Sequence, residues 1–265
     1  MYLQFEDGGD AVFAGRFNAG FGRAWDDAPG IYGADFAADY EFNEKLGLGG
    51  AVKVDGRLGR HALGLKLYTA DHTGLSRGLL ERRFEDRSGR PRWRNRESYP
   101  GSGNTAAPQS IVASASGEDI GGVDGLTYTL GLIYETGDDG AADQRGGLIG
   151  FGYSWETGEG LTVTLLTEFA ALDRYLGGQE NRRYATGGVE LAFGGWTGSL
   201  SGTLRHIDPL GRTAGPDTTD LLGQATAGYT FANGIGLHLG WKIERIDNVR
   251  YETAGALVRY RYSLD

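Results

Sequence analysis

The chain of 265 residues contains no cysteine, one methionine, six prolines and four histidines. Without cysteine it can form neither disulfides nor thiolate metal sites, and four histidines leave little other ligand chemistry. A run of about 18 apolar residues, which a transmembrane helix requires, is also absent. The net charge of −9 argues against nucleic acid as a partner. These absences exclude disulfide scaffolds and helical membrane proteins, and they disfavour nucleic-acid-binding domains.

Glycine is the residue that the chain has in excess. The 47 glycines are roughly 18 % of the sequence, more than twice the usual ~7 %. No G-X-Y period accompanies them, which excludes a collagen helix, and 40 % hydrophobic residues exclude a wholly disordered chain. The mean hydropathy of −0.36 is hydrophilic. It still permits a membrane β-barrel, because only alternate residues of such a barrel face lipid.

Alternation of apolar with small or polar residues dominates the chain. After an Asn233-Gly234 turn, Leu237, Leu239 and Trp241 alternate with small, polar or charged residues, which predicts a β-hairpin. Fourteen such segments predict fourteen strands, one of them at 36–42, where apolar residues alternate mainly with acidic ones. Helical spacing is best at 75–85, and all six prolines fall between the strand segments.

Three features favour a transmembrane β-barrel over a soluble β-sandwich. Most strand segments match the ~9–11 residues that cross a bilayer at a tilt, whereas ordinary strands have ~5–6. One face of each strand is rich in Gly, Ser, Thr and charged residues, and the apolar stripes of the other face end in aromatic residues. Short links such as 158–160 and 194–196 alternate with longer polar ones such as 176–182 and 209–220, which is the loop asymmetry of outer-membrane barrels.

Residues 11–53 and the hairpins between 183 and 264 carry a family resemblance. They resemble Gram-negative outer-membrane porins, most closely the porin-like proteins of α-proteobacteria. The resemblance implies a single antiparallel transmembrane β-barrel over 1–265, located in the outer membrane, and it favours a homotrimer. It also implies outer-membrane lipid and lipopolysaccharide as partners and small hydrophilic solutes as cargo.

The two ends of the chain depart from the porin pattern. Residues 2–6 already alternate, without the basic region and apolar core of a signal peptide, so we expect a removed leader or a late gene start. The resemblance implies that an earlier strand precedes them. That strand, together with one crossing hidden in 72–110, would raise the count from fourteen to sixteen. The chain ends in Asp265, whereas such porins usually end in an aromatic residue.

The longest predicted connection is the loop 72–110. Its part 72–100 carries eight arginines and four acidic residues, a net +4 in a chain whose remainder is −13. One interpretation folds the loop into the lumen as a constriction where arginines attract anions or face acids across the pore. The other keeps it outside, bound to lipopolysaccharide phosphates or solvated. The candidate constriction residues are Arg77, Arg82, Arg83, Arg87, Arg90, Arg92, Arg94 and Arg96.

Ionisable residues that the alternation assigns to the polar face of the strands are candidates for the lumen wall. Charges of both signs are ordinary in a diffusion pore, so they predict a wet lumen and no particular substrate. These wall candidates are Arg16, Lys53, Lys66, Glu135, Glu168, Glu190, Arg205, Lys242, Arg245, Arg259 and Arg261.

Signals of an enzyme are weak. Residues 74–78 fit G-x-S-x-G around Ser76, but that nucleophile elbow requires a strand before it and a helix after it in an α/β sheet. His238 is the only histidine on the polar face of a predicted strand, and a lone histidine there is usually a wall residue. We therefore predict no catalytic residue, no metal and no cofactor.

The sequence as a whole predicts a water-filled channel for passive diffusion of small hydrophilic solutes and ions across the outer membrane. Three alternatives remain open at this stage. They are an outer-membrane barrel enzyme of the lipase or protease type, a structural or adhesion barrel with a plugged lumen, and a soluble β-sandwich binding protein.

Overall fold

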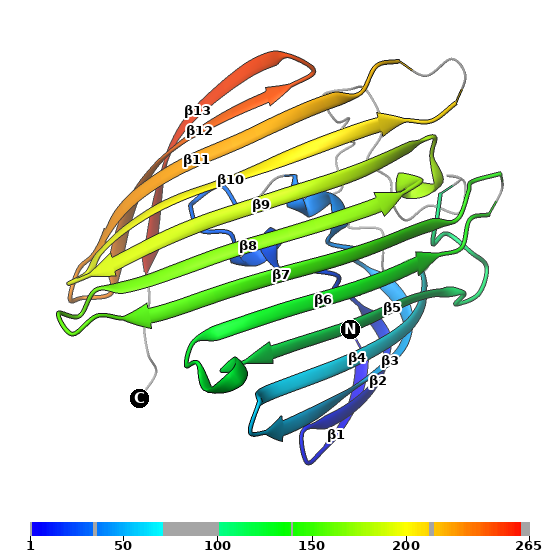
Figure 1. Cartoon of the computed structure of the whole chain (residues 1–265), viewed down its shortest axis with the longest axis horizontal. Coiled ribbons are helices and arrows are strands. Elements are labelled where there is room, and N and C mark those ends of the chain that lie inside the picture. The colour runs from blue at the N-terminus through cyan, green and yellow to red at the C-terminus, as the bar shows by residue number, and fades with distance from the viewer. Residues whose placement is uncertain (1, 34–35, 71–100, 139, 212–214, 261–265) are drawn as a thin grey trace.

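A computed structural model describes residues 2–33, 36–70, 101–138, 140–211 and 215–260 (Figure 1). These residues form one antiparallel sheet of thirteen strands, and strands that follow each other in sequence lie side by side. The strands are β1 (Tyr2–Asp7), β2 (Asp10–Phe17), β3 (Lys45–Gly56), β4 (Gly59–Ala70), β5 (Ser110–Glu118), β6 (Leu126–Glu135), β7 (Gln144–Glu156), β8 (Thr162–Asp173), β9 (Glu180–Phe193), β10 (Trp196–Pro209), β11 (Thr218–Thr230), β12 (Ile235–Ile246) and β13 (Val249–Tyr260).

The all-β antiparallel architecture is confirmed, whereas one detail of the predicted strand set is wrong. Residues 36–42 form no strand, because their centre is the short 3-10 helix η1 (Ala37–Tyr40). The extra crossing proposed within 72–110 falls mostly outside the described residues, and the strands on either side of it, β4 and β5, pair directly and antiparallel from Tyr68↔Ser110 to Arg60↔Glu118. The described count is therefore thirteen. Among the described residues β1 pairs only with β2 and β13 only with β12, so both strands are edges of the sheet.

The connections differ in length at the two ends of the strands. At one end, here called the short-turn end, β1–β2, β3–β4 and β9–β10 are joined by two residues each. At the other, the long-loop end, 18–44 joins β2 to β3 and 71–109 joins β4 to β5. The β12–β13 turn at 247–248 is a short exception at the long-loop end. The predicted asymmetry is thus present, and short turns on one side with long loops on the other are typical of outer-membrane barrels.

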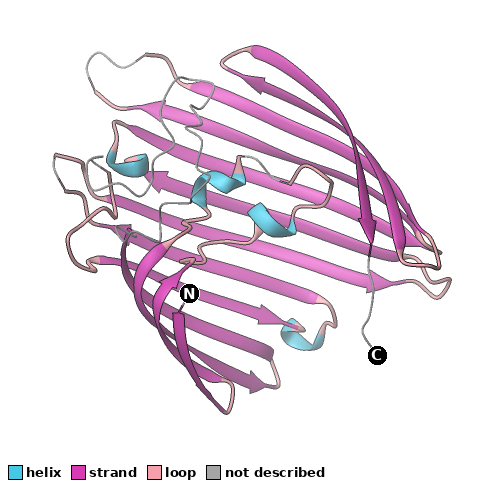
Figure 2. Cartoon of the chain, turned by 180° about the vertical axis from the view of Figure 1, so that it is seen from behind, coloured by secondary structure: helices cyan, strands magenta, loops and turns pink. Residues whose placement is uncertain are grey.

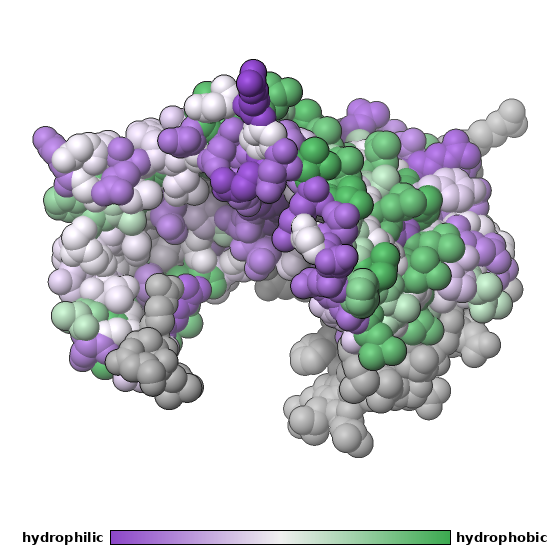
Figure 3. Space-filling view, turned by 90° about the horizontal axis from the view of Figure 1, so that it is seen from below, coloured by the Kyte–Doolittle hydropathy of each residue, from purple (hydrophilic) through white to green (hydrophobic). Residues whose placement is uncertain are grey.

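The sheet is strongly curved and has an apolar outer face. Leu132, Leu200 and Leu239 are each more than half exposed on its convex side. Directly opposed residues share a face, so the register extends this assignment to every strand. Figure 3 shows the molecule hollowed between two arms, with hydrophilic residues gathered above the hollow and apolar residues beside them. We call the concave side the inner face and the convex side the outer face.

The concave side of the sheet holds the segment 18–44, called the inner segment below (Figure 2). It contains the helix α1 (Ala24–Asp27) and η1, and two further single turns, η3 (Ile120–Gly122) and η4 (Tyr175–Gly177), lie in other connections. None of the described helices is long and apolar enough to cross a membrane. The buried apolar cluster lies between the inner segment and the wall, where Phe21 packs against Tyr40 and Phe42, and Tyr40 packs against Tyr184 of β9.

Candidate pore constriction

Eight of the eleven predicted wall residues lie on the inner face. The register places Lys53, Lys66, Glu135, Glu168, Glu190, Arg205, Lys242 and Arg259 there, on the side of the sheet that the inner segment contacts. Among the described residues, Lys53, Glu190 and Arg259 have no ion-pair partner. Charged groups of both signs therefore line the hollow.

Two predicted wall residues lie on the opposite face. Arg16 is directly opposed to Leu46 and pairs with Glu44, on the same side as the exposed Leu48. Arg245 is two residues from Ile243 and four from Trp241, and it opposes Leu221, so it too points outward. The assignment of Arg16 and Arg245 to the polar face by alternation was therefore wrong; at Arg245 it conflicts with Leu237, Leu239 and Trp241 of the same strand, which share its parity and lie outward. Arg261 and the eight constriction candidates from Arg77 to Arg96 lie outside the described residues.

A carboxylate of the wall binds the beginning of the inner segment. Glu168 of β8 is buried and accepts hydrogen bonds from the backbone N–H of Arg23 at 2.8 Å and of Ala24 at 3.0 Å. These N–H groups open α1, where no preceding turn supplies acceptors. The hydroxyl of Tyr40 donates to the same carboxylate at 2.9 Å, and its burial beside that charge raises the pKa of Tyr40. One side chain thus joins both halves of the segment to the wall.

A carboxylate of the inner segment binds the wall in return. Oδ2 of Asp39 in η1 accepts hydrogen bonds from Arg182 and Tyr184 of β9 and from Arg205 of β10, each at 3.0 Å. Arg205 also donates to Asp220 at 2.6 Å, and its guanidinium lies over the ring of Phe36, 4.3 Å from the centroid. Charge-assisted hydrogen bonds of this kind are shorter and stronger than neutral ones. The cluster fixes η1 against two neighbouring strands.

A third ionic contact lies where the inner segment becomes β3. Nζ of Lys45 is 2.8 Å from Oε1 of Glu135, whose side chain is fully buried. The same carboxylate accepts hydrogen bonds from Tyr68, Ser102 and Gln144. Because all four partners donate to the Glu135 carboxylate, this buried charge has its hydrogen bonds satisfied. The contact fixes the end of the inner segment that leads into β3.

The tip of the inner segment reaches the far wall through neutral contacts. The hydroxyl of Tyr32 donates to the carbonyl of Gly240 in β12 at 2.9 Å and to that of Thr253 in β13 at 3.3 Å. Ser201 donates to the carbonyl of Pro29 at 2.8 Å, and Gln224 donates to that of Gly33 at 2.7 Å. The segment therefore crosses the hollow from β2 to β13.

Glycines of the wall make room for this tip. A Cβ atom on Gly240 would lie 2.6 Å from Ile31, one on Gly255 would lie 2.7 Å from the Tyr32 hydroxyl, and one on Gly188 would lie 2.6 Å from Pro29. Contacts shorter than 3.0 Å do not occur between real Cβ atoms and their neighbours. Part of the glycine excess on the inner face thus serves close docking of the segment.

Sequence reasoning missed the inner segment and the partners that hold it. Asp39, Lys45 and Arg182 were not among the wall candidates, although Arg182 lies on the inner side of an alternating strand. The sequence does contain residues that argue against a strand through 18–33. These are Pro29 and glycines such as Gly20 and Gly22, both of which have positive φ. No signal in the sequence connects Asp39 to arginines that are more than 140 residues away.

Side chains that could hold a metal ion are not clustered in the described part of the chain. No cluster of three or more His, Asp or Glu side chains that could hold a metal occurs among those residues. His238 lies on the inner face of β12, next to Gly228 and Gly236, as expected for a wall residue. The G-x-S-x-G stretch around Ser76 lies outside the described residues.

Comparison with known proteins finds likeness in structure and none in sequence. No family model matches the chain, and no curated protein matches it. The crystal structure of the outer membrane channel DcaP of Acinetobacter baumannii is similar with a TM-score of 0.55 and 12 % identity, over 98 % of this chain and 83 % of that one. Pseudomonas aeruginosa OccK5 (OpdH) is similar with a TM-score of 0.45 and 11 % identity, over 97 % and 78 %. The likeness to DcaP shows that the chain has the fold of an outer-membrane channel.

Proposed function

We propose that this protein is an outer-membrane porin, a water-filled channel through which small hydrophilic solutes and ions diffuse passively. The observation that carries the proposal is the pairing of an apolar outer face with a charged inner face that a folded segment crosses. A soluble β-sandwich would cover a sheet face that exposes so many large apolar side chains. A fully plugged barrel would neutralise or bury the inner charges, whereas Lys53, Glu190 and Arg259 have no ion-pair partner among the described residues.

In this proposal the inner segment sets the width of the channel. It is held at both ends by buried charges and reaches the opposite wall, so it narrows the lumen over a fixed part of the cross-section. Solutes pass through the space that the segment leaves, and the wall charges bias which ions pass. The arginines from Arg77 to Arg96 remain proposed contributors to ion selectivity, and a homotrimer remains a proposal.

Planar lipid bilayers test the channel. Pure refolded protein should give discrete current steps in salt solution without any energy source. With the same salt concentration on both sides of the bilayer, the current should be zero at zero applied voltage. Protein that inserts into the bilayer but carries no current would refute the porin proposal and favour a plugged barrel.

Replacing the arginines between 77 and 96 by serine should shift the reversal potential in a salt gradient, and an unchanged potential would place them away from the constriction.

A further inference from the structure

A row of hydroxyl groups crosses the inner face of five neighbouring strands, from β7 to β11. The register places one inward residue of each strand directly opposite the next. These five residues, called the hydroxyl row below, are Ser154, Thr164, Glu190, Ser199 and Thr226. Four of them carry a hydroxyl group, and the central one, Glu190, carries a carboxylate. The row is therefore uniformly polar, with a single charge at its centre.

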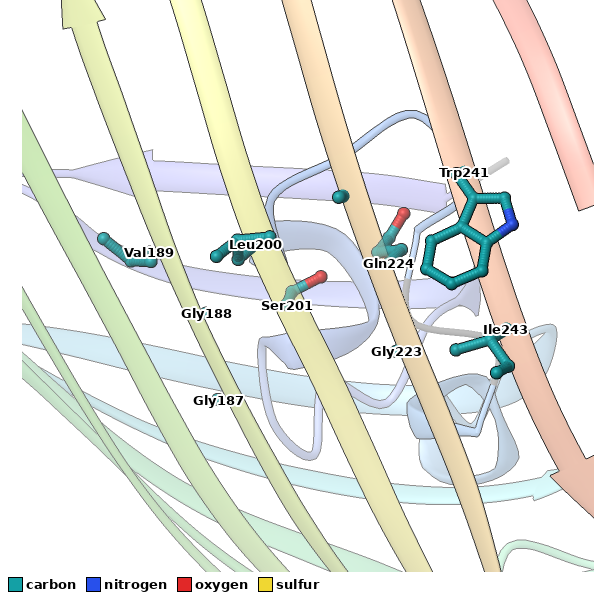
Figure 4. A pocket seen from close by; sticks show the side chains of 10 residues that line it. Gly187, Gly188, Val189, Leu200, Ser201, Gly223, Gln224, Trp241 and Ile243 are labelled. Carbon is teal, nitrogen blue, oxygen red and sulfur yellow. The ribbon is translucent and has the colours of Figure 1, made fainter.

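The hydroxyl row lies directly on the short-turn side of the tip of the inner segment, 29–33. The neighbouring inward positions of β9, β10 and β11, two residues away along each strand, are Gly188, Ser201 and Gln224, which contact the tip. Figure 4 labels these three residues side by side on their strands. The backbone N–H of Ile31 donates to Oγ1 of Thr226 at 3.2 Å, so the row begins at the tip itself. A solute that passes the tip toward the short-turn end meets the hydroxyl row next.

The carboxylate of Glu190 has no counterion among the described residues. The residue is half-buried, with the buried Ser199 on one side of it and the exposed Thr164 on the other. Oγ1 of Thr164 lies 3.0 Å from Oγ of Ser154, which is exposed as well. A carboxylate accepts hydrogen bonds only, whereas a hydroxyl group both accepts and donates. The open part of the row can therefore bind an ammonium group at Glu190 and hydroxyl groups beside it.

The charges around the hydroxyl row favour cations. On the short-turn side of the tip, the inner face from β7 to β11 carries two carboxylates, Glu156 and Glu190, and neither lysine nor arginine. The basic inward residues of β9, β10 and β12 lie at the tip or on its long-loop side, and each has a carboxylate partner. They are Arg182, Arg205 and Lys242. The electrostatic potential along the row is therefore negative, which raises the local concentration of cations and lowers that of anions.

We infer that the hydroxyl row determines the specificity of the channel, and that the preferred solutes are small organic cations that carry hydroxyl groups. The ammonium group of such a solute donates charge-assisted hydrogen bonds to the Glu190 carboxylate. Its hydroxyl groups exchange hydrogen bonds with Ser154 and Thr164 in place of water. A neutral solute gains only the second contact, and an anion is repelled by Glu190. The inference rests on the proposed channel and names the class of solute that the channel prefers.

Ion selectivity of the refolded full chain in planar bilayers tests the charge of the row. Glu190→Gln keeps the size of the side chain and removes its charge. In water, a unit charge at about 7 Å changes the local concentration of a monovalent ion about threefold. The permeability ratio of K⁺ to Cl⁻, obtained from the reversal potential in a KCl gradient, should therefore fall at least about threefold below that of wild type. The matched control, Glu252→Gln, removes the same charge from the outer face of β13, opposite Ile243, and should leave the ratio unchanged.

A pair of organic cations tests the hydroxyl groups of the row. Protonated glucosamine and cyclohexylammonium both have a six-membered ring and one positive charge, but only glucosamine carries hydroxyl groups. Thr164→Val removes one hydroxyl group of the row and keeps Glu190. Because a hydrogen bond is lost, the permeability of glucosamine relative to cyclohexylammonium should fall at least about twofold. Thr167→Val is the matched control, since Thr167 opposes the outward Phe151 on the other face of the same strand.

Three outcomes would overturn the inference. The first is a K⁺ to Cl⁻ permeability ratio that is the same in Glu190→Gln and wild type. The second is an equal fall of this ratio in Glu190→Gln and Glu252→Gln, which would mean that the position of the charge does not matter. The third is an unchanged preference for glucosamine in Thr164→Val. Each of these leaves a conducting channel and refutes only its assigned specificity, whereas wild-type protein without current would refute the channel proposal itself.

Discussion

The inner segment is fixed to the wall in two different ways along its length. Near its ends, three carboxylates hold it: the buried Glu168 binds Arg23 and Ala24, the half-buried Asp39 binds the arginines of β9 and β10, and the buried Glu135 binds Lys45. At its tip, 29–33, the hydrogen bonds are neutral and the backbone approaches glycines closely, and Nζ of Lys242 lies 5.5 Å from the centroid of the Tyr32 ring. Near its ends, the segment is held by charges that are costly to separate from their partners. At the tip, its position depends on glycines of the wall, which have no side chain to block the approach.

This difference predicts unequal effects of substitution. Removing a carboxylate that accepts several charge-assisted hydrogen bonds costs several kcal/mol, because each such bond contributes about 1.5–3 kcal/mol. Removing a neutral hydrogen bond costs about 0.5–1.5 kcal/mol. The variants below are ordered by the expected change in the free energy of unfolding, and each is paired with a second variant for comparison.

Asp39→Ala should have the largest effect. It removes the acceptor of three hydrogen bonds, from Arg182, Tyr184 and Arg205, so we expect a loss of about 3–5 kcal/mol in the free energy of unfolding, although Glu180 and Asp220 still pair with the two arginines. The freed segment should also raise the single-channel conductance. Unfolding in urea and bilayer recording measure the two effects. Asp26→Ala, an exposed acid in the same segment, is the control and should change neither quantity as strongly.

Glu168→Gln should follow, with a loss of about 1.5–3 kcal/mol. The amide keeps one acceptor oxygen, but its NH2 group meets donors, since Arg23, Ala24 and Tyr40 all donate to this side chain. Urea unfolding measures the loss. Glu190→Gln removes the same charge from the inner face at a residue with no ion pair among those described. Equal losses in the two variants would mean that Glu168 does not position the segment.

Gly240→Ala tests whether clearance alone fixes the tip. The new Cβ would lie 2.6 Å from Ile31, so the tip must move into the lumen, at a cost of about 1–3 kcal/mol and with lower conductance. Gly198→Ala is the control, because nothing lies within 4 Å of a Cβ at that position. Wild-type conductance in both variants would show that the tip does not border the open path.

Tyr32→Phe should have the smallest effect. It deletes a hydroxyl that donates to two backbone carbonyls, so we expect a loss of about 0.5–1.5 kcal/mol and nearly unchanged conductance. The same substitution at Tyr40 removes a donor from the buried Glu168 and should cost more. Thermal or urea unfolding of both variants measures the two losses in the free energy of unfolding. A larger loss at Tyr32 would reverse the contrast between tip and ends.

The wall of this protein was predictable from sequence, whereas the contents of its lumen were not. In strands such as β12, successive residues lie on opposite faces of the sheet. The sequence shows this directly, because its apolar and polar residues alternate with a period of two. At 36–42 a similar alternation arises because Phe36, Tyr40 and Phe42 are buried against the wall in a segment that pairs with no strand. Alternation reports which side chains are buried, and only backbone pairing makes a strand.

The candidate site was predictable only in part for a related reason. Wall residues such as Glu168 and Arg205 follow from their position in an alternating strand, which requires no knowledge of distant residues. Their partners Arg23, Asp39 and Tyr40 belong to another part of the chain, and the sequence contains no local sign of that contact. At Arg16 and Arg245 the predicted face was wrong, because both residues lie on the outer face near the ends of their strands.

The contact of Tyr32 with Thr253 has a consequence for the order of assembly. The two residues are 221 positions apart, and Thr253 belongs to the last strand of the sheet. Such a distant contact forms only after the chain between has been brought together, because closing a long loop costs entropy before any contact repays it. We therefore expect the tip to dock as a late folding event. A chain arrested before β13 would keep the contacts of the tip with β10, β11 and β12 but lack the one with Thr253.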